Sequence, residues 1–307
     1  MFNLKVVKYK KFWLIFSGAT LALALTALIT WGLNFGIDFT GGSLMEVKFN
    51  GQQPNVIQVK ESLADLNLSS LSVQPTTDNS IILRFKEDSL DVHEQVKTNL
   101  NSLAIELNGD NQVSGSVIEE LRFDSVGPSI GKELKNKSFN TISLALIVII
   151  IYIAIVFKKV SKPVASWKYG IAAIIALAHD IIIVLGVFAV LGRFLNVEIN
   201  ATFIAAILTV LGYSVNDTII TFDRTRENLP KSNDNFENTV NKSINQTLTR
   251  TIFTSFTTLL SLIAIIIFGG SSIREFVLAL AIGIFVGTYS SLFVASPVIL
   301  LFNRKRK

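Results

Sequence analysis

Six long apolar runs limit most strongly what this chain can fold into. A helical run of about 20 residues, at a rise of about 1.5 Å per residue, spans the roughly 30 Å hydrocarbon core of a bilayer. Charged residues fall largely between the runs, which are residues 12–31, 139–157, 171–192, 201–222, 251–268 and 276–302. The pattern predicts six transmembrane helices and excludes a soluble enzyme.

The reactive side chains are few. The chain has no cysteine, which excludes structural disulfides, thiolate catalysis and cysteine zinc sites. Its two histidines, His93 and His179, lie in different segments and predict no metal site. No glycine-rich phosphate-binding motif is present, so we expect neither nucleotide hydrolysis nor a bound cofactor.

Lysine and arginine predict the orientation of the bundle. The first run is longer than the 7–15 apolar residues of a signal peptide, so we expect a retained helix. Basic residues gather in the N-terminus, the second-to-third and fourth-to-fifth connections and the C-terminus. Six spans place all four on one side, which is then cytoplasmic. The formal charge of +5 is therefore a topology signal, and no nucleic-acid partner is expected.

The expected organisation follows from these assignments. The predicted segments are a cytoplasmic N-terminus at 1–11, a first transmembrane helix at 12–33, an extracytoplasmic domain at 34–138, a five-helix region at 139–302 with cytoplasmic loops at 158–170 and 223–250, and a basic cytoplasmic C-terminus at 303–307.

The segment 34–138 is long enough for one small domain. Alternating or apolar stretches predict strands, and apolar residues at helical spacing predict two helices. The predicted elements are strands at 43–50, 71–75, 80–86 and 117–124, with helices at 54–67 and 88–107. The order βαββαβ predicts a ferredoxin-like α+β domain, and nothing in it is typical of a catalytic site.

One five-residue stretch matches the G-x-S-x-G motif of a nucleophilic serine, namely Gly127-Pro128-Ser129-Ile130-Gly131. That chemistry requires a strand-turn-helix elbow together with a histidine base and a carboxylate. Here the motif leads into the second span, and proline directly precedes the serine. We therefore expect a structural hinge.

Three ionisable residues within the spans are candidates for function. A charged side chain there costs about 2.5–3.5 kcal/mol on insertion scales. Asp217 near the inner end of span four and Arg250 at the start of span five fall in similar layers, because these spans are antiparallel. Burial and a facing guanidinium act oppositely on a carboxylate, so small rearrangements could load or release a proton. Asp180 is the third candidate, although a structural hydrogen bond would also explain it, and His179 is expected to pack or support it.

Polar residues on spans four and five follow helical spacing beside these groups. The two sets are Thr202, Ala205, Thr209, Gly212, Asn216 and Asp217, and Arg250, Thr254, Thr257, Thr258 and Ser261. They could carry water and relay protons, or they could join helices through hydrogen bonds. Both interpretations stay open.

Span six carries a set of small residues. Its members recur every four residues and are Ala279, Gly283, Gly287 and Ser291. Such a ridge lets another helix approach closely, either within the chain or in a partner subunit.

Five motifs together resemble one family. They are Gly36-Ile37-Asp38-Phe39-Thr40-Gly41-Gly42, Val126 to Leu134, Ala178-His179-Asp180, Gly212 to Asn228, and Ser243 to Thr251. In this order, and over nearly the whole chain, they resemble the SecD/SecF family of protein-export membrane proteins, in particular its SecF members.

The resemblance implies a fold like half of a resistance-nodulation-division transporter. It implies a bacterial inner-membrane subunit that joins SecD, assists protein passage through SecYEG after the SecA motor acts, and uses the proton-motive force. Expected partners are SecD, SecYEG, YajC, the translocating polypeptide and membrane lipids. The larger SecD half is not in this sequence, so a separate partner is expected.

The resemblance also assigns roles to residues. Asp217 and Arg250 match the family's proton pathway, to which we add Asp180, with supporting roles expected for Asn216, Thr254 and His179. The family signature positions are Gly36, Asp38, Gly41, Gly42, Gly127, Pro128 and Gly131. Asp38 either caps a glycine-containing turn or contacts the partner.

Two other functions stay open. One is a transporter subunit of related fold that exports a small or lipidic substrate. The other is a subunit that only stabilises SecD. Sodium instead of protons at the carboxylate also stays open.

Overall fold

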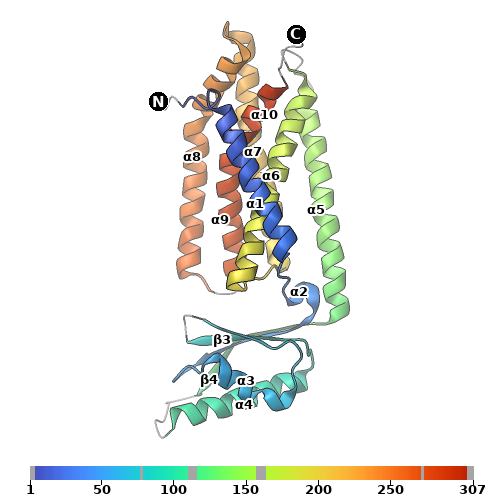
Figure 1. The fold of residues 1–307 in the computed structure, drawn as a ribbon, viewed down its shortest axis with the longest axis vertical. Helices are drawn as coiled ribbons and strands as arrows, with labels where there is room; N and C mark the ends of the chain where they lie inside the picture. Colours follow the sequence, from blue (N-terminus) through green and yellow to red (C-terminus); the bar gives the residue numbers. More distant parts are fainter. Residues whose placement is uncertain (1–3, 77–78, 110–115, 157–163, 271–272, 303–307) are drawn as a thin grey trace. The chain divides into compact units, whose positions relative to one another are not determined.

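The computed structural model describes the chain except residues 1–3, 77–78, 110–115, 157–163, 271–272 and 303–307. It forms two compact units, one made of Met1–Asn34 with Phe139–Lys307 and the other of Phe35–Ser138 (Figure 1). The expected basic C-terminus at 303–307, the start of the expected N-terminus and part of the expected loop at 158–170 lie outside the described residues.

Within the described residues, six helical segments are long and apolar enough to cross a membrane, which confirms the prediction of six spans. They are α1 (Lys10–Trp31), α5 (Pro128–Val156), α6 (Ser166–Leu195), α7 (Ala201–Asn228), α8 (Phe236–Phe268), and α9 (Arg274–Ser290) continued by a π-helical turn (Ser291–Ala295) and α10 (Ser296–Leu301). The start of α1 and the end of α10 lie at the same end of the bundle (Figure 1).

Several helices extend beyond the apolar runs. Pro128 begins α5, where its fixed φ and missing N–H fit the first turn of a helix. A 3₁₀ turn at Leu229–Lys231 directly follows α7, and the Asn235 side chain caps the start of α8. Only residues 232–235 between the two helices are therefore non-helical. The connection predicted as a loop at 223–250 is therefore mainly helical.

Small residues allow α9 to pack closely against α7. A Cβ atom added at Gly283 would lie 2.2 Å from a Val210 methyl carbon, and one at Gly287 would lie 2.8 Å from Ser214 Cβ. Ala279, on the same ridge, is fully buried. The small-residue ridge of span six therefore packs within the chain, as one of its two interpretations predicted.

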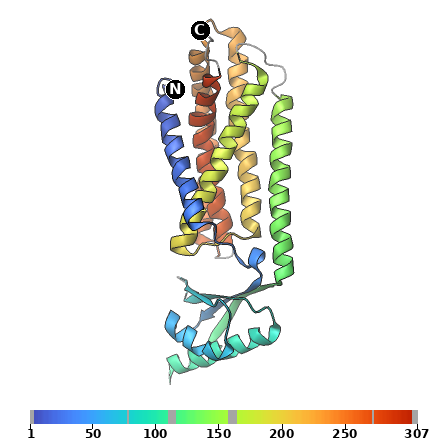
Figure 2. The same cartoon turned by 45° about the vertical axis from the view of Figure 1, so that its right-hand side comes forward.

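Helix α5 lies at the edge of the bundle in both views (Figures 1 and 2). Large apolar side chains such as Leu144 and Ile155 are more than half exposed along it. Its contacts with the bundle include the buried Ile153 and a hydrogen bond from Arg226 Nη1 to Val156 O at 3.4 Å. Its apolar surface is therefore available to lipid or to another protein.

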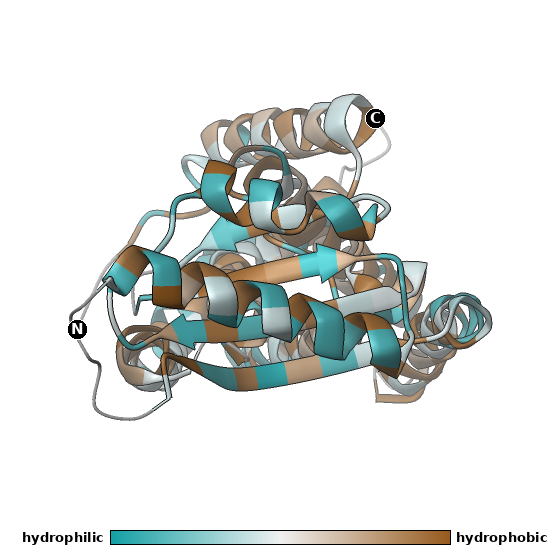
Figure 3. Ribbon diagram, turned by 90° about the horizontal axis from the view of Figure 1, so that it is seen from below, coloured by the Kyte–Doolittle hydropathy of each residue, from teal (hydrophilic) through white to brown (hydrophobic). Residues whose placement is uncertain are grey.

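The second unit is a two-layer α+β domain with a four-stranded antiparallel sheet in the order β2-β3-β1-β4. The elements are α2 (Ile37–Thr40), β1 (Gly42–Phe49), α3 (Val56–Ser62), β2 (Ser72–Pro75), β3 (Ser80–Phe85), α4 (Leu90–Asn108) and β4 (Ile118–Val126). Helices α3 and α4 lie over one face of the sheet (Figure 3). The order βαββαβ confirms the predicted ferredoxin-like domain.

The core of this domain is formed by residues that recur every two positions in the strands and every three or four positions in the helices. Alternate residues of β1 and β3, such as Met45, Val47 and Leu83, are fully buried against Val96 and Leu100 of α4. The helix predicted at 54–67 is wrong at its end, because α3 stops at Ser62 and a 3₁₀ turn follows. Leu63, the residue directly after the α-helix, is buried, and the left-handed conformation of Asn67, with φ of 48°, ends the 3₁₀ turn.

Candidate functional site

A polar cavity of about 320 Å³ lies between α7 and α8. Its lining comes from the two polar sets predicted on spans four and five and consists of Tyr213, Asn216, Asp217, Ile220, Arg250, Thr254, Thr257 and Thr258. The structure therefore brings together Asp217, Arg250, Asn216 and Thr254, four of the residues expected to act together.

Asp217 is 3% exposed, and its Oδ2 atom has no hydrogen-bond partner among the described residues. Arg250 lies across the cavity with an exposed side chain. Within the described part of the chain, no ion pair shorter than 4.0 Å joins Asp217 to Arg250. Among the described residues, the two groups line one cavity and no ion pair or hydrogen bond joins them. A buried carboxylate without a hydrogen-bond partner is costly when it is ionised.

The hydroxyl groups of α8 that line the cavity bond to their own helix. Thr254 Oγ1 donates to Arg250 O at 3.0 Å, and Thr258 Oγ1 donates to Thr254 O at 2.9 Å. Thr257 donates in the same way to Phe253 O at 2.9 Å. Among the residues that the structure describes, no hydrogen bond from these threonines joins α8 to another helix. Each hydroxyl oxygen keeps acceptor capacity for water in the cavity.

Asp180 occupies a different environment in the bundle core. It is 1% exposed, and its Oδ2 accepts hydrogen bonds from Ser214 Oγ at 2.6 Å and Ser290 Oγ at 2.7 Å. Its Oδ1 lies 3.0 Å from His179 Nδ1. Asp180 thus joins α6 to α7 and α9, and it does not line the cavity of Asp217. The structure thus places Asp180 and His179 in a hydrogen-bonded cluster between helices, outside the polar cavity.

The sequence predicted neither Tyr213 as a residue of the cavity nor the π-helical turn near it. Tyr213 lines the cavity, and its hydroxyl group donates to Ser255 Oγ at 3.4 Å, which in turn accepts from Thr288 Oγ1 at 2.6 Å. The π-helical turn places Ser291 Oγ 3.0 Å from Thr218 Oγ1 of α7. Such turns are rare and often occur at functional sites. Polar residues within apolar runs were the only available signal, and they do not reveal helix register.

The two glycine motifs meet in the second unit, residues 35–138. Gly41 and Gly42 have φ of +76° and +121°, which side chains rarely adopt. An added Cβ would lie 2.8 Å from Pro128 Cα at Gly41 and 2.5 Å from Phe85 O at Gly42. At Gly131 it would lie 3.0 Å from Gly41 N. The glycines thus allow β1 and the start of α5 to pack together. Asp38 lies in the first turn of α2.

The G-x-S-x-G letters do follow a strand and begin a helix, but the other catalytic groups do not assemble. Ser129 is exposed at the start of α5 and, within the described residues, bonds to neither histidine. His93 Nε2 instead lies 3.1 Å from a Glu120 carboxylate oxygen. Among the residues that the structure describes, no group of three histidine, aspartate or glutamate side chains could hold a metal ion.

A family model for the protein export membrane protein SecD/SecF, C-terminal, matches residues 109–305, and one for the SecD/SecF GG motif matches residues 26–53. The chain belongs to the SecD/SecF family. The GG-motif match includes Gly41 and Gly42, the pair whose positive φ angles are rarely adopted by residues with side chains.

Relatives within the SecD/SecF family match nearly the full chain. The protein translocase subunit SecF of Thermobaculum terrenum is 41% identical over 91% of this chain and 87% of its own length. SecF of Rhodothermus marinus is 38% identical over 97% of this chain and 92% of its own. The family match therefore indicates a protein-transport component, not an enzyme.

A solved SecD/SecF-family structure has the same fold. The crystal structure of SecDF, a translocon-associated membrane protein from Thermus thermophilus, is 30% identical, with a TM-score of 0.81. The match covers 99% of this chain and 39% of that chain, so this protein spans about two fifths of its length. A SecDF structure in a super-membrane-facing form matches with a TM-score of 0.66.

Proposed function

We propose that this chain is a SecF subunit of a bacterial Sec translocase that promotes protein translocation across the cytoplasmic membrane. It joins a separate SecD subunit and uses the proton-motive force. Full-length likeness to curated SecF subunits supports the assignment. Likeness to about two fifths of a SecDF chain supports a partner that supplies the remainder.

The surface of α7 supports a SecD contact. Small and polar residues on this helix are exposed in the isolated chain, namely Thr202, Ala205, Thr209, Gly212 and Asn216. Helices in membranes pack through such small and polar residues, whereas lipid tails gain nothing from them. The polar cavity lies beside this surface, so SecD would cover it and shield Asp217 from lipid.

The mechanism that we propose is protonation and deprotonation of Asp217. The observation that carries it is the buried Oδ2 atom without a partner, in a cavity lined by hydroxyl and amide groups. Water held there by Asn216 and Thr254 would deliver the proton. Approach of Arg250 would favour the ionised carboxylate, and its withdrawal would favour the protonated one. One charge moved through the membrane potential is worth about 2.3 kcal/mol per 100 mV, enough to bias a conformational equilibrium.

Asp180 has a positioning role in this proposal. Its hydrogen bond from Ser214 fixes α7 one turn before Asp217, and the bond from Ser290 fixes α9. His179 holds the other carboxylate oxygen. A change of charge at Asp217 would therefore act on α7 while hydrogen bonds to Asp180 connect this helix to α6 and α9.

The proposed topology places both termini in the cytoplasm and residues 34–138 outside. The basic segments support this orientation, since lysine and arginine collect on the cytoplasmic side. The exported domain is joined to the bundle by two chain connections, after α1 and within α5. Helix movements driven by Asp217 would reach the domain through these connections.

The test is export into membrane vesicles, with and without a proton gradient, for native protein, Asp217→Asn and Asp223→Asn. Asp223 is a matched control because it lies on α7, outside the cavity, and pairs with Arg226 at 3.5 Å. We expect Asp217→Asn to lose the gradient-dependent part of export and Asp223→Asn to keep it. Full gradient-dependent export by an assembled Asp217→Asn complex would refute the proposal.

A further inference from the structure

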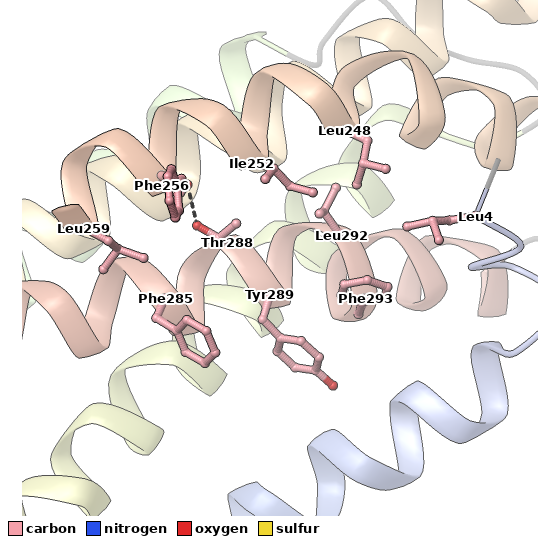
Figure 4. Close-up of a pocket in the computed structure, with 11 residues that line it drawn as sticks. Leu4, Leu248, Ile252, Phe256, Leu259, Phe285, Thr288, Tyr289, Leu292 and Phe293 are labelled. Carbon is pink, nitrogen blue, oxygen red and sulfur yellow. Dashed lines mark hydrogen bonds between the residues drawn. The ribbon is translucent and has the colours of Figure 1, made fainter. Parts of the chain in front are cut away.

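A second cavity, of about 330 Å³, lies on the other side of α8 from the polar cavity, along α9 and the N-terminal segment (Figure 4). Its lining is almost entirely apolar and includes Leu4, Ile252, Phe256, Phe285 and Leu292. The polar groups Ser255 and Thr288 bond to each other at 2.6 Å, so the walls need no external hydrogen-bond partner. We call this cavity the α8–α9 groove.

The shape of the α8–α9 groove fits a narrow chain. From Leu248 to Leu259 the groove follows α8 for about 16 Å at 1.5 Å per residue, from the end near Leu4 towards the middle of the bilayer. A single extended hydrocarbon chain can lie along an apolar groove of this length.

Charge at one end of the groove indicates the headgroup. Leu4 is held there by hydrogen bonds with the Asn245 side chain, one of which is 2.7 Å. Lys5 follows directly and is exposed, as are Lys8 and Lys11. In the described part of the chain, no acidic side chain forms an ion pair with these three lysines. Cationic side chains at a membrane surface attract anionic lipid headgroups.

We propose that the α8–α9 groove binds one acyl chain of an anionic phospholipid, from the leaflet on the side of the chain termini, with the phosphate near Lys5 and Lys8. The groove supplies the apolar contacts, and the lysines supply the preference for negative charge. This inference goes beyond the proposed function and does not depend on proton coupling. The bound chain would contact α8 beside Ser255, whose Oγ also accepts from Tyr213 of the polar cavity.

The test is native mass spectrometry of the full chain in detergent, titrated with phosphatidylglycerol or phosphatidylcholine. Ile252→Trp fills the groove, and Ile263→Trp is its matched control on the same helix, since Ile252 is 43% and Ile263 47% exposed, and only Ile252 lines the groove. We expect one retained phosphatidylglycerol, an affinity about tenfold lower in Ile252→Trp through lost methylene contacts, and no change in Ile263→Trp.

A second variant avoids any effect on folding. Lys5→Gln with Lys8→Gln changes two exposed side chains and should lower the preference for phosphatidylglycerol over phosphatidylcholine by about fivefold per lysine. Equal binding of both lipids to the native chain, or native-like lipid binding by Ile252→Trp, would overturn the proposal. Loss of SecD co-purification in Ile252→Trp, with lipid binding intact, would assign the groove to a partner subunit and also overturn it.

Discussion

Replacing Gly287 by alanine should destabilise the crossing of α7 and α9. The new methyl group would lie 2.8 Å from Ser214 Cβ, which cannot rotate away because it is fixed to the backbone of α7. Overpacking of this kind costs about 1–3 kcal/mol, and the gain in helix propensity returns up to about 1 kcal/mol. We expect a net loss of about 1–2 kcal/mol in the free energy of unfolding. Displacement of Ser214 would also weaken its 2.6 Å bond to Asp180.

The assay is thermal unfolding of the purified chain in detergent, with Gly212→Ala as the control. Gly212 is also in a helix, but an added Cβ there would meet nothing within 4 Å. At about 2–4 °C per kcal/mol, Gly287→Ala should lower Tm by about 2–8 °C. Gly212→Ala should leave Tm unchanged or raise it. Equal Tm values for the two variants would refute the close packing that we describe.

Three further predictions concern the buried Asp180, the glycine pair at the start of β1 and the proposed SecD surface of α7. Asp180→Ala should cost about 2–3 kcal/mol of unfolding free energy, because hydroxyl donors lose their acceptor, whereas Asp180→Asn should cost less in the same thermal assay. Gly42→Ala, at a φ of +121°, should lower Tm more than Gly109→Ala, at +54° in open space; similar losses would contradict the strain argument. Gly212→Leu should reduce co-purification of SecD without lowering the Tm of the isolated chain, and intact assembly would exclude α7 from the interface.

Local patterns in the sequence were sufficient for most of the fold. The six spans follow from the length of the apolar runs, and the βαββαβ order follows from periods of two and 3.6 residues. The end of α3 could not be predicted in this way. Leu63 continues the apolar helical pattern, but it is buried just after the helix ends. Element boundaries depend on packing that a local pattern does not contain.

Part of the membership of the candidate site was predictable, although Tyr213 was missed and Asp180 lies elsewhere, but the contacts were not. Because burying a charge in a membrane span is costly, Asp217 and Arg250 were predicted as functional residues. The antiparallel order of spans four and five predicted that they lie at a similar depth in the membrane, and both line one cavity. Whether two such groups touch depends on the rotation of each helix, and the structure places them on one cavity without an ion pair. The same dependence on rotation hid the hydrogen bonds of Asp180 to two other helices. Packing of Gly131 against Gly41 joins residues far apart in sequence and had no local signal.

The most direct test of the account is proton movement during export. Proteoliposomes holding this chain, SecD and the translocation channel, with a pH-sensitive dye inside, would report proton flux while a substrate protein is translocated. The account predicts flux that accompanies translocation in native protein and in Asp223→Asn, and that is lost in Asp217→Asn. Undiminished, translocation-dependent flux in Asp217→Asn would contradict the claim that this carboxylate carries the proton.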